Sequence, residues 1–420
     1  MVKKGILAIV ALSLMLSLII GAVGCDGGEE ATPTPTATAE PTETAEPTAT
    51  AEPTATAEPT ATEAPEITIG AVMCLTGGLS GMGPDIRDGA LLSINEINAA
   101  GGVNGSHLRL ITEDSATEAT TGLEAVKKLV EINGVKVIIG PMISGATLAA
   151  GPYVGEREVV IISPSATSPD IADQEWREFV FRTAPTDAFQ GVAMAQLVEE
   201  GGYERAAIFV MDNQYGVGIE EVLEDALTVE IVSTARYDPV KLDYLTELQI
   251  IKDSNPDVVL HVGYGDDAQI VYKQALELGM DTAQWITSEG VYAEATLEMA
   301  EAAEFMSKAV IGTKPAAPEG SAYDDFAAAF EAEFGHAPGV YAENAYDAMS
   351  LAALAIEQAG YDDGAAISAA LTTIGQDYSG ISGTITFADN GDRLGGYYEV
   401  WKVVEEDGVY SYERIKVISL

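Results

Sequence analysis

The sequence predicts an α/β fold built on parallel sheets, and three observations lead to that prediction. From Glu66 onward, short runs of β-branched and aliphatic residues alternate with stretches of helical period. These runs are apolar at consecutive positions, as expected of strands that are buried on both faces. More strands are expected than one domain of this class normally uses, so the 420 residues are expected to form more than one such unit.

The expected strands and helices alternate along the chain. Runs such as ITIGAVMC, VVIIS and DVVLHVG predict strands, and the strand ranges are 67–74, 107–114, 135–140, 159–163, 179–185, 205–212, 229–238 and 257–263. Longer segments with apolar residues three and four apart, such as LTELQIIKDSN, predict helices, and the helix ranges are 88–102, 119–131, 147–158, 188–202, 245–255 and 268–279. This order is typical of βα units, which form parallel sheets with helices on both faces.

The N-terminus has the layout of a signal peptide. Lys3 and Lys4 precede an apolar run over 6–20, and GAVGC then places small residues before Cys25. This signal resembles the bacterial lipoprotein type, which implies that residues 1–25 end at a lipidated Cys25. An uncleaved transmembrane helix is the alternative. Both readings place the rest of the chain outside the cytoplasm.

Residues 26–65 are predicted to be a disordered tether. The segment repeats a Thr/Ala/Glu/Pro hexad, TATAEP in its most frequent form, and contains no basic residue. Proline at every sixth position blocks helix and sheet, and the segment has no large apolar side chain to bury.

Charge and motif content exclude several classes of protein. The chain has 66 acidic and 21 basic residues, a net charge of -45, which would repel nucleic acid. It has no G-x-S-x-G elbow and no Walker loop. Its three histidines lack metal-ligand spacing: His107, His261 and His336. VGYGDDA resembles a dinucleotide fingerprint, but Asp266 and Asp267 would repel a pyrophosphate. We therefore expect no enzyme, cofactor or metal site.

Two expected strand ends carry small and hydroxylated residues. VVIIS leads into PSATS, residues 164–168, and VKVIIG leads into PMISG, residues 141–145. In open α/β folds the ligand lies outside the carboxyl ends of the strands, where helix N-termini aim free N–H groups outward. Ser144 and Thr167 could each be plain N-caps, but two strand ends with the same chemistry favour a binding site.

The sequence resembles a known family, the extracytoplasmic solute-binding proteins of the Leu/Ile/Val-binding type that serve ABC importers. The resemblance runs from Ile67 almost to Leu420. It is carried by these motifs in order: IGAVMCLTGGLSGMG, DGALLSINEINAAGGVNG, IIGPMISGATLAAGPY, IISPSATSPD, FRTAPTDAFQG, DNQYGVG, GYGDDA, SEG, AENAYDAM and GTITFADNGDR.

This resemblance implies two doubly wound, Rossmann-like lobes joined by three crossovers, the type I periplasmic-binding-protein fold. The crossings are expected near Pro185, Pro315 and Asp389. Lobe 1 would comprise 66–185 plus 316–389, and lobe 2 would comprise 186–315 plus 390–420. The ligand would be held in the cleft as the lobes close.

The resemblance also implies a set of ligand-binding residues. The ligand carboxylate would be held by hydroxyls and backbone N–H groups, with no arginine required, at Ser144, Ala166 and Thr167. Glu289, after a short strand, would bind the ammonium, and Tyr215 would close the cleft. The side-chain subsite would be formed by Met82, Met142, Tyr264 and Tyr341.

The expected function is extracytoplasmic capture of a small zwitterionic solute, a branched-chain or other hydrophobic amino acid. The protein is expected to be a monomer, anchored by lipid to the outer face of the cytoplasmic membrane, that delivers its ligand to ABC permease subunits. Two alternatives stay open from the sequence. The chain could be a ligand-sensing module for a membrane receptor, or it could bind short amides, urea or aromatic acids.

Overall fold

The computed structural model describes residues 65–420. The predicted signal peptide over 1–25, including Cys25, lies outside the described residues, as does the tether over 26–65 except for Pro65. Within residues 65–420, no helix has the length and apolar character needed to cross a membrane.

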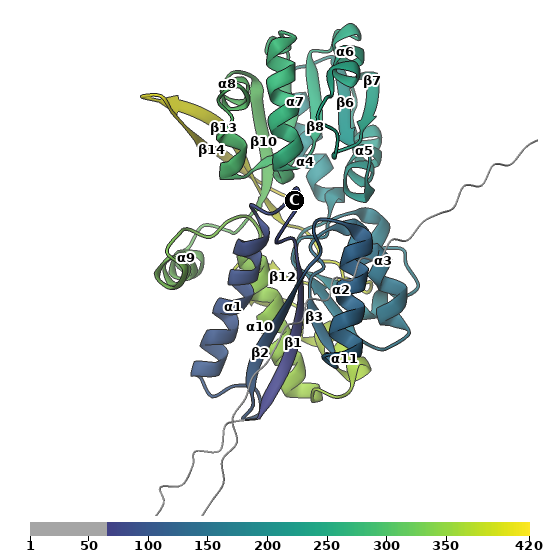
Figure 1. Cartoon of the computed structure of the whole chain (residues 1–420), viewed down its shortest axis with the longest axis vertical. Helices are drawn as coiled ribbons and strands as arrows, with labels where there is room; N and C mark the ends of the chain where they lie inside the picture. Colours follow the sequence, from purple (N-terminus) through teal and green to yellow (C-terminus); the bar gives the residue numbers. More distant parts are fainter. Residues whose placement is uncertain (1–64) are drawn as a thin grey trace, which may run out of the picture. The chain divides into compact units, whose positions relative to one another are not determined.

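The first lobe is built on a parallel five-stranded sheet in the order β2-β1-β3-β4-β5 (Figure 1). Its strands are β1 (Glu66–Met73), β2 (His107–Asp114), β3 (Val137–Ile139), β4 (Val160–Ser163) and β5 (Val180–Arg182). Its helices are α1 (Gly83–Ala99), α2 (Ala119–Glu131), α3 (Ser144–Gly155), α10 (Ala342–Ala359) and α11 (Gly364–Ile374).

Helices cover both faces of this sheet, because successive side chains of a strand point to opposite faces. Ile69, Ala71 and Met73 pack with residues of α1, α10 and α11. Val72, between them in sequence, packs with residues of α2 and α3. The apolar run at consecutive positions is therefore explained by two cores, one on each side of β1.

The second lobe is built on a seven-stranded sheet in the order β14-β13-β10-β9-β8-β6-β7 (Figure 1). Its parallel strands are β6 (Arg205–Met211), β7 (Glu230–Tyr237), β8 (Val258–Val262), β9 (Gln284–Thr287) and β10 (Val310–Ala316). An antiparallel hairpin, β13 (Tyr397–Glu406) and β14 (Val409–Ser419), extends the sheet beside β10. The helices are α4 (Asp187–Gly201), α5 (Gln214–Ala226), α6 (Leu245–Asp253), α7 (Gly265–Glu277) and α8 (Ala300–Ala309).

Smaller elements complete the described chain. A helix, α9 (Ser321–Phe334), follows β10, and two short strands, β11 (Tyr378–Gly380) and β12 (Gly383–Ile385), pair with each other. Short 3-10 helices lie at Pro169–Ile171, Arg177–Phe179, Glu289–Val291 and Glu294–Leu297.

Each predicted strand and helix has a counterpart in the structure, with differences at the ends. The first helix begins at Gly83 rather than 88, because Pro84 fits the first turn of a helix, where its missing N–H is not needed. The third helix begins at Ser144 rather than 147, so this serine lies in the first turn. The β13–β14 hairpin was not predicted, since VYSYERIKVIS mixes polar and apolar residues without a buried run.

The chain passes between the two sheets three times. It leaves the first sheet after Arg182 and enters α4 at Asp187. It returns after Ala316, and it passes again between Ile385 and Tyr397. The predicted limits of the lobes, 66–185 plus 316–389 and 186–315 plus 390–420, stay a prediction.

Candidate functional site

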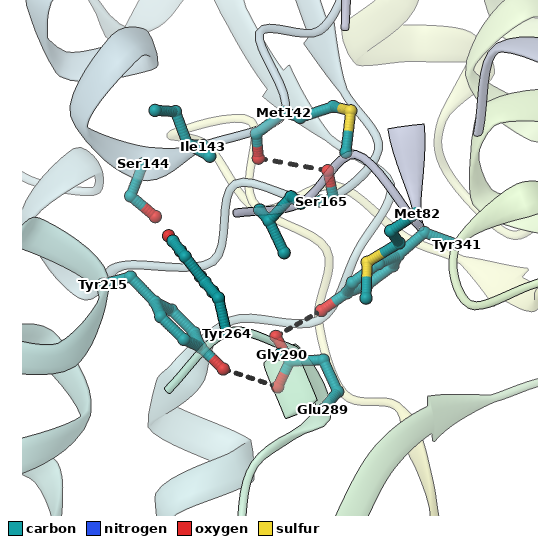
Figure 2. A pocket seen from close by; sticks show the side chains of 11 residues that line it. Met82, Met142, Ile143, Ser144, Ser165, Tyr215, Tyr264, Glu289, Gly290 and Tyr341 are labelled. Carbon is teal, nitrogen blue, oxygen red and sulfur yellow. Dashed lines mark hydrogen bonds between the residues drawn. The ribbon is translucent and has the colours of Figure 1, made fainter. Parts of the chain in front are cut away.

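A cavity lies where the carboxyl ends of the strands of both sheets face each other (Figure 2). Its volume is about 20 Å³, about the space of one water molecule, so a larger ligand can enter only when the lobes move apart. The first lobe contributes Leu79, Met82, Met142, Ile143, Ser144, Ser165 and Tyr341, and the second contributes Tyr215, Tyr264, Glu289 and Gly290. A ligand here would contact both lobes at once.

Most of the predicted site residues line this cavity. They are Met82, Met142, Ser144, Tyr215, Tyr264, Glu289 and Tyr341. Ala166 and Thr167 do not line it. The N–H of Ala166 donates to the Ser163 hydroxyl at 3.0 Å, so it is already satisfied. Ser165, which the sequence reasoning did not select, lines the cavity beside them.

One end of the site offers donors that suit a carboxylate. Ser144 lies in the first turn of α3, where backbone N–H groups lack partners within the helix and the helix dipole favours negative charge. Its hydroxyl accepts the N–H of Ser168 at 3.1 Å, which ties the start of α3 to the loop after β4. Thr167 is buried in that loop, and its hydroxyl has no hydrogen-bond partner among residues 65–420.

Glu289 occupies the opposite end of the cavity. It follows β9 and is 4% exposed. The hydroxyl of Tyr215 donates to its Oε2 at 2.8 Å, and the hydroxyl of Tyr341 donates to its Oε1 at 3.0 Å (Figure 2). Burial raises the pKa of Glu289, and the hydrogen bond from Tyr215 lowers it. Among residues 65–420 no salt bridge involves this carboxylate, so its charge is open to a cation from outside.

The structure adds Asp187, which sequence reasoning missed. This residue begins α4, is fully buried, and neither carboxylate oxygen has a hydrogen-bond partner within the described chain. Burial raises the pKa of Asp187 well above its ordinary value, and the charge of Glu289 raises it further. The carboxyl groups of Asp187 and Glu289 are thus both buried, and their negative charges repel each other. An arriving cation would relieve the repulsion between them.

Asp187 also lies beside the loop after β4. Its backbone N–H donates to the carbonyl of Thr167 at 2.9 Å, which holds the start of α4 against this loop. The only sequence signal was an acidic residue directly after a crossing and before a helix. In that position an acid usually interacts with the helix N-terminus.

Apolar and aromatic side chains form the remaining wall. Leu79, Met82, Met142 and Ile143 line the cavity. The thioether of Met142 accepts the N–H of Cys74 at 3.1 Å, which restrains this otherwise adaptable side chain. The rings of Tyr215 and Tyr264 stack with centroids 5.7 Å apart. This wall suits a compact aliphatic group.

Tyr341 adopts a conformation that is uncommon for a tyrosine. Its φ of +69° lies in the left-handed region, immediately before α10. Such strain is retained where the surroundings fix the residue, and it is frequent at binding sites. Here the strained backbone carries the ring whose hydroxyl binds Glu289.

Comparisons with known proteins agree with this architecture. A family model described as "Periplasmic binding protein" matches residues 66–408. The chain is 28% identical over 326 residues to the leucine-, isoleucine-, valine-, threonine- and alanine-binding protein of Pseudomonas aeruginosa, covering 76% of this chain and 84% of that one.

Solved structures show the same fold. The isoleucine complex of the branched-chain amino acid transporter substrate-binding protein LivJ from Streptococcus pneumoniae has a TM-score of 0.72 and 24% identity, over 83% of this chain and 99% of that one. A solute-binding protein from R. palustris in complex with 4-hydroxybenzoate has a TM-score of 0.75 and 17% identity, over 84% and 97% of the two chains. The resemblance noted in the sequence is confirmed, and the chain belongs to the periplasmic binding protein family.

Proposed function

We propose that this protein captures a small hydrophobic amino acid, such as leucine, isoleucine or valine, outside the cytoplasm and delivers it to an ABC importer. The observation that carries the proposal is the environment of Glu289. This buried carboxylate accepts two phenol hydrogen bonds, has no cation partner in the described chain, and lies in a cavity between the two lobes.

The cavity matches each part of such a ligand. The start of α3, with Ser144, and the loop that contains Thr167 face the carboxylate. Glu289, supported by Asp187, takes the ammonium, because a buried anion gains most from a cation that fills its remaining hydrogen-bonding capacity. Met82 and Met142 contact the aliphatic side chain.

Capture then proceeds by closure of the lobes. Ser144 belongs to the first lobe and Glu289 to the second, so one zwitterion binds the two lobes together. A ligand that contacts both sides stabilises the closed arrangement over the open one, which is how hinge-bending binding proteins respond to ligand. A permease would recognise the ligand-bound protein by this closed form.

The relative from Pseudomonas aeruginosa, named for binding leucine, isoleucine, valine, threonine and alanine, supports an amino-acid ligand. The 4-hydroxybenzoate complex motivates a second candidate, an aromatic acid. Such a ligand would use the Ser144 end but would leave Glu289 and Asp187 without a cation. We favour the amino acid for that reason.

Members of this family act outside the cytoplasm. We place this chain on the outer face of the cytoplasmic membrane, as a monomer held by lipid on Cys25. Support comes from the GAVGC motif and the hexad segment that follows it. The sensing alternative shares the same site, so it predicts the same ligand but a receptor in place of a permease.

Titration calorimetry tests the ligand class directly. We expect leucine to bind more tightly than 4-methylpentanoate, which has the same carbon skeleton without the amine. Equal binding of the two compounds would overturn the amino-acid assignment. Tighter binding of 4-hydroxybenzoate than of leucine would establish the second candidate.

A further inference from the structure

Arg182, at the end of β5, lies behind the loop that follows β4 and does not line the cavity. We propose that Arg182 is a positioning residue for carboxylate recognition, which turns the backbone N–H of Thr167 toward the ligand while an ion pair with Asp392 anchors it. This inference rests on the proposed function, because it concerns the carboxylate end of the same site.

The hydrogen bonds of Arg182 support this role. Its side chain is fully buried, and its Nη1 donates to the carbonyl of Ser168 at 2.7 Å and to that of Ala166 at 3.3 Å. One guanidinium group thus holds the carbonyls on both sides of Thr167. Residues 164–168 form no strand or helix, so no regular backbone hydrogen bonding fixes the path of this loop.

Peptide geometry connects these bonds to the cleft. The C=O and N–H of a trans peptide unit point in opposite directions. The carbonyl of Ala166 and the N–H of Thr167 belong to the same peptide unit, so holding that oxygen toward Arg182 directs the N–H away from it. Within the described chain this N–H has no hydrogen-bond acceptor. Thr167 does not itself line the cavity, but it lies two residues after Ser165, which does, so its unengaged N–H stands at the edge of the site, where a bound carboxylate would reach it.

Asp392 anchors the arginine from another part of the chain. It lies in the third connection between the sheets, and its Oδ1 accepts the Nε of Arg182 at 2.7 Å. The backbone N–H of Arg182 also donates to the carbonyl of Gly391 at 3.1 Å. Arg182 thereby joins the first and third connections between the lobes. Because it also holds the loop over 164–168, movement of the hinge and the geometry of that loop are linked.

Arg177 provides a matched comparison. It binds the same Asp392, but it donates to the backbone carbonyl of Val180 and forms no hydrogen bond with residues 166–168. Both arginines are buried, at 4% and 0% exposure, and each substitution disturbs the same ion cluster. Only the substitution of Arg182 should change how the loop presents Thr167.

The test compares leucine with leucinamide, which lacks the carboxylate charge, by calorimetry on the full folded domain. Lysine carries the charge but cannot reproduce the fork of donors. We expect Arg182→Lys to weaken leucine binding about tenfold to a hundredfold, the size of a lost charge-assisted hydrogen bond. Leucinamide binding should change less than about threefold, within the range of small indirect effects. Arg177→Lys should preserve the leucine preference.

Two further measurements keep the outcome clear. If Arg182→Lys does not fold, as judged by circular dichroism, Asp392→Asn releases the anchor and should lower the leucine preference in the same direction. The amide resonance of Thr167 in ligand-free protein should shift or broaden in Arg182→Lys and not in Arg177→Lys. This readout is independent of any ligand, so it decides the role of Arg182 even if leucine does not bind and the proposed function fails. An unchanged Thr167 resonance, or equal losses for both ligands, would overturn the proposal.

Discussion

Replacement of Glu289 by glutamine is the most direct test of the ammonium site. The change removes the charge and keeps nearly the same shape. Glutamine offers one oxygen acceptor where the carboxylate has two, so Tyr215 and Tyr341 cannot both keep their present bonds at 2.8 and 3.0 Å. The ligand ammonium would then be buried against a neutral side-chain amide, and one of the two tyrosine hydroxyls would lose its present hydrogen bond.

The expected magnitude follows from the burial of Glu289. Truncating one partner of a buried, hydrogen-bonded charge pair costs about 2 to 5 kcal/mol, or roughly 30-fold to several-thousand-fold in affinity. Asp187 does not line the cavity, but its carboxyl is close enough to interact with that of Glu289, so it still contributes negative charge behind the site in the variant. We therefore expect the lower half of that range for leucine, about 2 to 3.5 kcal/mol.

The assay is calorimetry with leucine and 4-methylpentanoate on both proteins. Glu289→Gln should lose most of the preference of the wild type for the amine, since only leucine carries the group that Glu289 binds. Glu343→Gln serves as the matched control, because Glu343 is buried to a similar extent, at 5% exposure, and does not line the cavity. A Glu289→Gln protein that prefers leucine as strongly as the wild type would refute the reasoning.

Four further outcomes follow from the same structure. Asp187→Asn should also reduce the leucine preference. In the wild type, leucine binding below neutral pH should release protons, because the ligand ammonium favours the charged form of Asp187 and Glu289, whose pKa values are raised. Calorimetry in buffers of different ionisation enthalpy measures this release. Burial raises the pKa of Glu343 from 4.5 to about 7, so its contribution to stability is present below about pH 4.5 and is lost as pH rises toward 7. Denaturation across this window should show a loss of about 3 kcal/mol that Glu343→Gln removes, and an identical slope in the variant would contradict it. Small-angle scattering should give a smaller radius of gyration with leucine than without, and no change despite binding would indicate a rigid pocket. Cys25→Ser should abolish labelling by a fatty-acid analogue, whereas retained labelling would exclude lipid on that residue.

The sequence predicted most of the scaffold because most strands of the parallel core are marked twice, by β-branched residues and by the polar loop that follows, whereas β10 was not predicted. Ser144 could be selected for the same reason, since it begins the helix after a buried strand that ends at Ile139. The second-lobe residues Tyr215, Tyr264 and Glu289 could be selected only through motifs shared with a family. Nothing in their local pattern shows that they face the first lobe.

Other features depend on packing that local patterns do not encode. Asp187 reads as an ordinary helix-start acid, and only the assembled hinge shows that it is buried without a partner. Ala166 was expected to offer its N–H to the ligand, but the Ser163 hydroxyl at 3.0 Å takes that donor. Such competition between neighbouring donors and acceptors is set by the exact path of a loop.

The two phenol hydrogen bonds to Glu289 also set how many protons a ligand must bring. A carboxylate has about four lone-pair positions, and Tyr215 and Tyr341 occupy one on each oxygen. The positions left over can accept N–H groups of an incoming amine. A primary ammonium brings three and an N-methylated one brings fewer, while a quaternary ammonium brings none despite its equal charge. We therefore expect a betaine to bind more weakly than a primary amine of equal charge, because it brings no N–H group to the carboxylate.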